Sequence, residues 1–258
     1  MTPKRKAEKT QQGNPHGLTI QQHVLPARSI DRFAGDDGCV SVFFKEGPKK
    51  GKTARLAPRN PLFCAERVWD QRSENIMKKV YEDPFQDLAE RINSGETQSL
   101  GKQDNITATG FWGLWKARFL AKSNPPKDKQ AVDCTGIESQ ELREIIEKNH
   151  GVVINPDGTL PGSALAGMEI QKLIDRVFMR FGNRVWSISE ALESEFIVPD
   201  NPCLLYIPIS CKICLQVDDQ NLDGETFLTK ENLTIINKSL SEVASRYIFA
   251  NSFNQDFT

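Results

Sequence analysis

The feature that most constrains the fold is a change of hydrophobic period along the chain. Residues 39–44 read Cys-Val-Ser-Val-Phe-Phe, a pattern typical of a strand, and residues 53–56 follow as its hairpin partner. Apolar residues take helical spacing from about residue 73 to 182, and strand patterns then return as far as residues 247–250. Strands at both ends around helices predict an α+β fold. We expect one mainly antiparallel sheet, built from strands of both termini and packed against the central helical section.

The helical section contains boundary signals as well as periodicity. Pro84 predicts a kink or a split in the first helix, and a second helix over residues 104–122 stops before Pro125. Ser139 is a predicted N-cap for a short amphipathic helix over residues 139–150, and a longer helix follows over residues 165–181. The second helix carries several large apolar side chains, namely Phe111, Trp112, Trp115 and Phe119. These rings can stack nucleic-acid bases, but a helix so rich in them is typical of a protein core.

Length and composition indicate a folded chain with one substantial core. The chain has 258 residues, of which 38% are hydrophobic and 26% charged. We predict a flexible polar tail over residues 1–17 and a single domain over residues 18–258. The N-terminus lacks the apolar stretch of a secretory signal, and the apolar runs are too short to span a bilayer. The expectation is therefore a cytoplasmic protein with no membrane partner and with reduced cysteines.

Charge is distributed unevenly along the chain. Residues 1–72 hold 14 Lys and Arg against 7 Asp and Glu, a balance of +7 in a chain whose net charge is −1. Part of this excess lies in residues 45–59, which we call the basic loop, with Lys49, Lys50, Lys52 and Arg55 as candidate phosphate contacts. Its Gly-Pro-Lys-Lys-Gly-Lys-Thr stretch has too few residues between the glycines for a nucleotide-binding loop. The leading interpretation of the basic loop is an ordinary solvated hairpin loop, and the alternative is a patch that contacts the phosphates of a nucleic-acid partner.

Two short polar motifs at opposite ends of the chain form the candidate site. His23 lies three residues before Pro26, and histidine in such a position can act as a general base, bind a metal or bond a backbone carbonyl. Asp200 and Asn201 precede Pro202 at the end of an apolar strand, where the same residue types also build an ordinary Asx-turn. If strands of both termini share a sheet, these motifs can converge at one edge of it.

The order of these motifs resembles an uncharacterised family, the domain-of-unknown-function four-two-three-eight family. Three segments carry the resemblance: His23 with Pro26 and the following Arg32-Phe33, the Phe-Ile-Val-Pro-Asp-Asn-Pro run of residues 196–202, and the closing stretch from Asn237 to Ile248. The chain departs from the family pattern at Val24, where the family has tyrosine, and at Pro199, where it has serine. The resemblance runs from about residue 20 to 250 and implies relatives without implying an activity.

These observations lead to two hypotheses about function. The first is a nuclease-like hydrolase acting on nucleic acid, with His23, Asp200 and Glu66 as catalytic residues and a divalent metal as its expected cofactor. Its expected binding residues are Lys49, Lys50, Lys52, Arg55, Asn201 and Arg246. The alternative is a non-catalytic module that binds nucleic acid or protein, in which His23 and Asp200 stabilise the fold. A small-molecule enzyme is a third option and requires a deep pocket.

Overall fold

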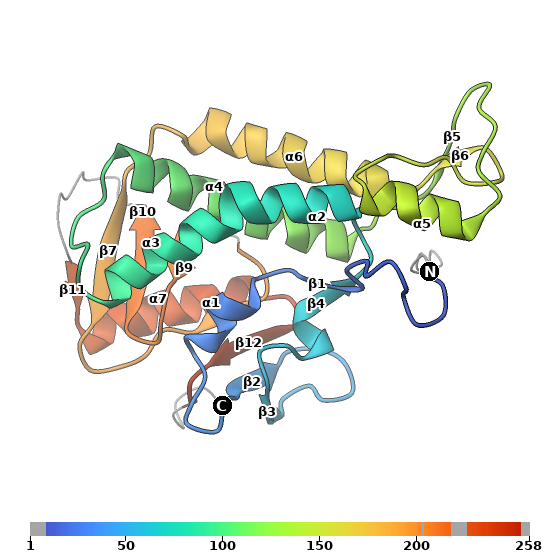
Figure 1. Cartoon of the computed structure of the whole chain (residues 1–258). Helices are drawn as coiled ribbons and strands as arrows, with labels where there is room; N and C mark the ends of the chain where they lie inside the picture. Colours follow the sequence, from blue (N-terminus) through green and yellow to red (C-terminus); the bar gives the residue numbers. More distant parts are fainter. Residues whose placement is uncertain (1–8, 203, 218–225, 254–258) are drawn as a thin grey trace.

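The computed structural model describes residues 9–202, 204–217 and 226–253 (Figure 1). The helices are α1 (Ala27–Asp31), α2 (Gln71–Met77), α3 (Asp83–Asn93), α4 (Lys102–Ser123), α5 (Gln140–Lys148), α6 (Gly162–Phe181) and α7 (Lys230–Val243), with a 3-10 turn η1 (Pro61–Phe63) and a π-helical turn η2 (Lys78–Glu82). The strands are β1 (Gln21–His23), β2 (Val40–Phe44), β3 (Thr53–Leu56), β4 (Cys64–Glu66), β5 (Lys129–Gln130), β6 (Thr159–Leu160), β7 (Trp186–Ala191), β8 (Val198–Pro199), β9 (Tyr206–Pro208), β10 (Ile213–Val217), β11 (Thr226–Leu228) and β12 (Tyr247–Ala250).

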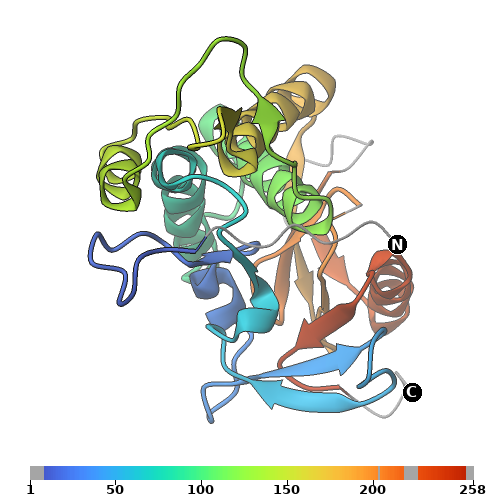
Figure 2. The ribbon, with the colours of Figure 1, turned by 90° about the vertical axis from the view of Figure 1, so that its right-hand side faces the viewer.

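Strands from the two ends of the chain share one sheet, as predicted. Its order is β3-β2-β12-β8, with all neighbours antiparallel, and the register places Val42 opposite Phe249. A second four-stranded sheet, β11-β7-β10-β9, contains one parallel pair, β11 with β7. Figure 1 shows the sheets below and beside the long helices, and Figure 2 shows α7 next to β12. The α+β class is confirmed, and within the described residues the structure adds this second four-stranded sheet and two two-stranded sheets, β1-β4 and β5-β6.

The apolar pattern of residues 196–198 predicts a strand there, whereas β8 covers Val198–Pro199. The backbone N–H of Phe196 donates to the carbonyl of Cys211 (2.8 Å), and that of Ile197 donates to the side chain of Asn237 (3.1 Å). These bonds lie outside a strand ladder, so β8 begins only at Val198. The acidic residues 218–225 that precede β11 lie outside the described residues.

The long central helices pack closely because α4 carries two glycines on the contact face. A Cβ at Gly113 would lie 3.3 Å from Val177 of α6, and one at Gly110 would lie 2.9 Å from Tyr81. A side chain at Gly110 would require the ring of Tyr81 to move, and one at Gly113 would press tightly on Val177. The predicted split near Pro84 is present: a π-helical turn, η2, joins α2 to α3, and Pro84 lies in the first turn of α3.

Residues 9–17 contact α5, while residues 1–8 of the predicted tail lie outside the described residues. Ser139 caps α5 by accepting a hydrogen bond from the N–H of Leu142, as predicted. The helix buries Glu144, whose carboxylate accepts a hydrogen bond from the N–H of Gln11 (2.6 Å). Leu142 of the same helix is exposed to solvent. The polar partner on residue 11 explains why this helix directs a carboxylate inward.

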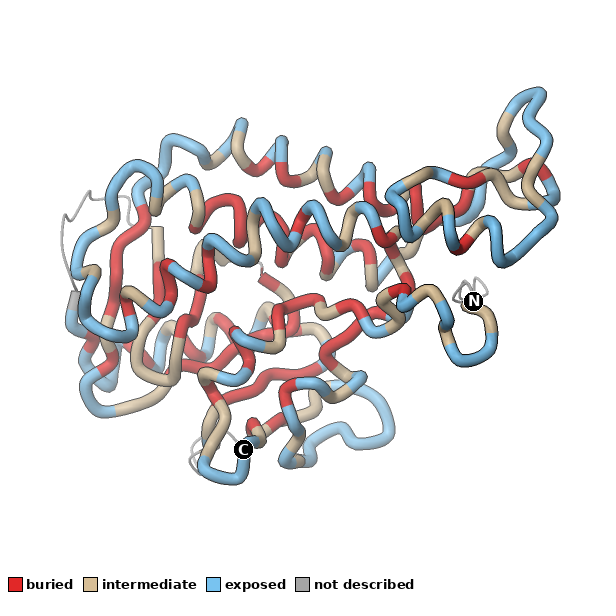
Figure 3. Tube along the Cα trace, viewed as in Figure 1, coloured by how far each residue is buried: buried red, intermediate tan, exposed pale blue. Residues whose placement is uncertain are grey.

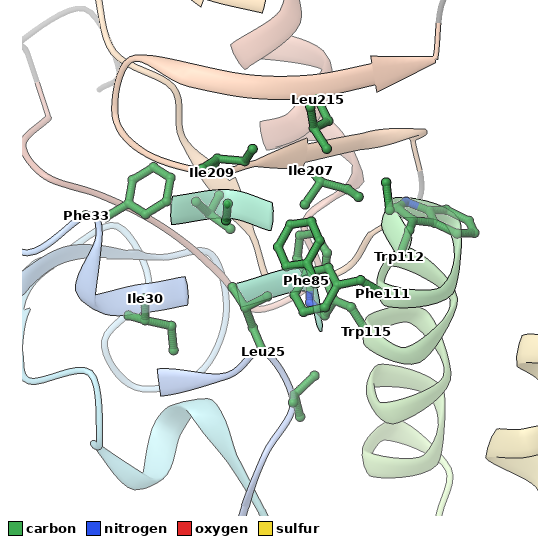
Figure 4. Packing of buried hydrophobic residues seen from close by; sticks show 14 of the residues in the cluster. Leu25, Ile30, Phe33, Phe85, Phe111, Trp112, Trp115, Ile207, Ile209 and Leu215 are labelled. Atoms are coloured by element: carbon green, nitrogen blue, oxygen red, sulfur yellow. The ribbon is translucent and has the colours of Figure 1, made fainter. Parts of the chain in front are cut away.

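The core lies between the helices and the two sheets (Figures 3 and 4). Phe85 of α3 and Phe111 of α4 stack with ring centroids 3.6 Å apart, and both are buried. Trp112 and Trp115 lie in the same cluster, so the interpretation of this aromatic helix as core is confirmed. Within the described residues, no helix is long and apolar enough to cross a membrane.

Replacing Phe111 with alanine should destabilise the protein by about 3–5 kcal/mol, because the ring is fully buried and its removal leaves a cavity under Phe85. Urea unfolding followed by circular dichroism measures this change. The control is Ile235→Ala on α7, where the side chain is 64% exposed and the expected change is within about 0.5 kcal/mol. Equal unfolding midpoints for the two variants would contradict the assignment of the core.

Candidate functional site

His23 is held at the end of β1 by the neighbouring strand and loop. It lies opposite Cys64 in the β1–β4 register, and its Nε2 lies 3.3 Å from the carbonyl oxygen of Pro58. A carbonyl only accepts, so this bond requires the proton on Nε2 and leaves Nδ1 as the basic nitrogen. Burial lowers the pKa of the imidazole below its ordinary value, although the bond to Pro58 opposes the shift. The ring is therefore neutral at pH 7.

Asp200 connects the end of β8 to the start of β12. Its carboxylate accepts hydrogen bonds from the backbone N–H groups of Ser245 (2.7 Å) and Arg246 (3.0 Å). Burial raises the pKa of this carboxyl, while the two backbone bonds act in the opposite direction. The sequence suggested a local Asx-turn as the structural explanation. The structure instead shows a long-range contact, which fixes the backbone that carries Arg246.

Asn201 also makes long-range contacts. Its side-chain oxygen accepts a hydrogen bond from Lys116 of α4 (3.0 Å), and its amide donates to the carbonyl of Val243 at the end of α7 (3.3 Å). Both ends of the side chain are therefore used to join elements. This arrangement explains the Asp-Asn pair through tertiary hydrogen bonding.

A cleft of about 660 Å³ lies where these elements meet. Its lining comes from the end of α4, the start of the basic loop, the end of β8 and the start of β12. The lining residues are Val24, Glu46, Gly47, Phe119, Lys122, Ser123, Asp200, Ser245, Arg246 and Tyr247. Two cations, Lys122 and Arg246, thus line one cleft from different elements.

Lys122 is a cleft residue whose pKa is lowered toward neutral pH. Burial lowers the pKa of its ammonium group to about 8, and the nearby guanidinium of Arg246 adds to the shift. The negative charge of Asp200 opposes the shift, and a thiolate at Cys64 would do the same. One N–H of the group donates to the carbonyl of Leu62 (2.8 Å).

The predictions from sequence did not include Lys122, although its spacing on α4 indicates partial burial. It lies seven residues after Trp115 on α4 and therefore shares the apolar face of that helix. A lysine in line with core positions near a helix end is a candidate for partial burial. Sequence spacing shows that shared face but does not show that Arg246, more than 100 residues away, lies beside it.

A buried ionic cluster lies on the same helix, one turn before Lys122. Arg118 is fully buried and forms ion pairs with Glu82 (3.0 Å) and Glu74 (3.3 Å), and the indole of Trp69 donates to Glu74 (2.6 Å). The charges of these groups also act on His23. The cluster therefore lies close to the β1–β4 pair, and its ion pairs join α4 to α2 and η2.

The other predicted residues take separate positions. Glu66 is exposed and pairs with Gln21 in the β1–β4 register. Arg55 donates to the carboxylate of Asp37 (2.9 Å), an interaction that lowers the pKa of Asp37 to about 2. Lys49 lies over the ring of Phe44 (5.5 Å), while Lys50 and Lys52 are exposed on the basic loop.

The structure brings the two predicted motifs to one cleft without direct contact between their key side chains. Val24, the residue after His23, lines the cleft together with Asp200. In the part of the chain that the structure describes, no hydrogen bond or ion pair joins His23, Asp200 and Glu66 to one another. The same residues contain no group of three or more His, Cys, Asp or Glu side chains arranged to hold a metal ion. The divalent metal stays a prediction.

No protein-family model, curated protein or solved structure matches this chain. The family resemblance of the sequence motifs therefore stays a prediction as well. The geometry of the cleft is the basis for inferring a function.

Replacing Asp200 with alanine should destabilise the protein by about 2 kcal/mol. The change leaves the N–H groups of Ser245 and Arg246 without their acceptor, and a buried donor without a partner costs about 1–3 kcal/mol. Relief of the carboxylate's own desolvation offsets part of that cost. Urea unfolding measures the difference. Glu66→Ala, at an exposed carboxylate, serves as the control and should stay within about 0.5 kcal/mol of wild type. Wild-type stability in Asp200→Ala would exclude the structural role.

Proposed function

We propose that this protein binds nucleic acid through the cleft, where Lys122 and Arg246 hold phosphate groups. The observation that carries the proposal is the position of these two cations, which line one cleft from α4 and from the start of β12. Phosphate binding requires positive charge within reach of the ligand, and cations on two walls can contact successive phosphates of a strand.

The cleft lining contains two carboxylates, Asp200 and Glu46, beside its two cations. Asp200 is turned toward two backbone N–H groups, and Glu46 lies on the exposed rim. The basic loop begins at this rim, and its exposed Lys50 and Lys52 extend the positive surface away from the cleft. This arrangement favours an anionic polymer that continues beyond the cleft.

The size of the cleft fits the same interpretation. A volume of about 660 Å³ lies within the range of roughly 300–1,000 Å³ typical of ligand pockets. Phe119, one turn before Lys122, gives one wall an aromatic surface on which an unpaired base can stack. Single-stranded nucleic acid is thus the ligand that the lining favours.

Arg246→Gln and Lys122→Gln should each weaken binding of a labelled single-stranded oligonucleotide, because each change removes a cation that neutralises a phosphate. The slope of log K against log salt concentration should become shallower by about 0.7 for each phosphate that is no longer neutralised. Fluorescence anisotropy over a series of salt concentrations measures both effects. Lys172→Gln removes the same charge from an exposed position on α6 and should change neither value. Unchanged affinity and slope in both cleft variants would refute the proposed site.

Hydrolysis of the bound strand is a second candidate function, favoured by the state of His23. Its imidazole is neutral with Nδ1 basic, and the next residue along the chain lines the cleft. This candidate requires the bound strand to extend past Val24 to the imidazole of His23, which does not itself line the cleft. This candidate keeps the predicted nuclease activity but transfers phosphate binding to Lys122, which the sequence did not identify, beside the predicted Arg246.

His23→Gln should abolish cleavage of the oligonucleotide while leaving its dissociation constant unchanged, because the base acts on bound substrate. The cleavage rate of the wild type should rise with pH to a plateau. The midpoint of this rise should lie below pH 6.5, because the pKa of His23 is lowered. Gel assays with and without Mg²⁺ measure the rate. Cleavage by His23→Gln at the wild-type rate would remove His23 from the reaction.

A further inference from the structure

The side chain of Lys122 has properties that phosphate binding alone does not need. A phosphate contact requires only an exposed positive charge, whereas this amine is recessed at the end of α4 between the β1–β4 pair and the start of β12. An ammonium carries three N–H donors, and within the described part of the chain one of them is used, by the carbonyl of Leu62 (2.8 Å). The group is therefore held in place without an ion pair to a carboxylate among those residues.

A recessed lysine beside another cation is the arrangement that makes a lysine nucleophilic. Only the neutral amine attacks a carbonyl, and a neighbouring positive charge together with poor solvation favours the neutral form. The charged and titratable groups that act on Lys122 are Arg246, Cys64 and Asp200. With its pKa lowered to about 8, a much larger fraction of the amine is neutral at pH 7 than in an ordinary lysine.

We propose that Lys122 condenses with a phosphate-bearing aldehyde or ketone in the cleft and forms an imine. The amine nitrogen attacks the carbonyl carbon and a carbon–nitrogen bond forms. The carbonyl oxygen then leaves as water with the two hydrogens of the amine, so the step needs no oxidant or reductant. Arg246 holds the phosphate of the ligand, a role that rests on the proposed function.

Two sources can supply this chemistry. An abasic sugar in a nucleic-acid strand exposes an aldehyde next to phosphates, and it follows directly from binding of a strand in the cleft. A free phosphorylated aldehyde such as glyceraldehyde 3-phosphate presents the same two groups without the strand. The two sources share the carbonyl and the phosphate, and they differ in whether the basic loop contributes.

Sodium borohydride reduces an imine to a stable amine and therefore records where condensation occurred. The purified full chain is incubated with an oligonucleotide that contains one abasic site or, separately, with glyceraldehyde 3-phosphate, and borohydride is added. Peptide mass spectrometry should place the adduct on Lys122 at least tenfold above the exposed Lys172. The yield of adduct at Lys122 should rise with pH, and the midpoint of the rise should lie near pH 8. For an exposed lysine the midpoint should lie near pH 10.5.

Lys122→Arg keeps the positive charge but does not form an imine, so its adduct at position 122 should disappear. The melting temperature of the variant shows whether it is folded. If it is not folded, the position of the adduct in the wild-type protein decides the question. Adducts spread over the surface lysines according to their exposure would overturn the proposal. So would equal trapping of the wild type and a folded Lys122→Arg.

The two proposals fail in different ways. If an intact oligonucleotide binds and neither aldehyde is trapped at Lys122, the imine is excluded while nucleic-acid binding stands. If glyceraldehyde 3-phosphate is trapped at Lys122 and no oligonucleotide binds, the reactive amine stands with a small ligand and nucleic-acid binding fails. Preferential trapping of the abasic oligonucleotide supports both.

Discussion

The ion pairs of Arg118 are the interaction on which the arrangement of the site depends. A fully buried guanidinium is costly to desolvate, and it is tolerated here because Glu74 and Glu82 both contact it and the ring of Trp69 lies 5.5 Å away. These partners belong to α2, η2 and the segment before them, so the charge specifies how α4 packs against that helix. One turn further along α4, the same packing places Lys122 at the cleft.

The cleft itself exists because distant parts of the chain share a sheet. β12 pairs with β2 on one side and with β8 on the other, and Asp200 then fastens the end of β8 to the backbone of Ser245 and Arg246. The start of the basic loop and the start of β12 thereby lie on the same side as the end of α4. Lys45 reinforces this closure by donating to the carbonyl of Ala244 (2.9 Å) at the end of α7.

Local sequence patterns predicted the elements well and their partners less well. The β2–β3 hairpin, the cap at Ser139 and the final strand depend on neighbouring residues, so propensity and period suffice to predict them. The site depends on contacts between residues far apart in the chain. Turn chemistry at Asp200 suggested a local bond, whereas its partners lie 45 and 46 residues away. Likewise, no pattern around Arg55 shows that Asp37 already neutralises it.

The contacts in and around the cleft make Lys122 a stronger functional candidate than the predicted His23 and Asp200. Asp200 uses its carboxylate to hold backbone, and His23 uses one ring nitrogen on Pro58, so each has a structural task that accounts for its position. Lys122 lies beside Arg246 without a carboxylate partner of its own in the described chain, and burial disfavours its charge. A protein that needed only stability would gain from replacing such a lysine with an apolar residue. Its presence at the wall of a cleft is therefore the stronger reason to seek function there, with His23 and Asp200 as the residues that build and flank it.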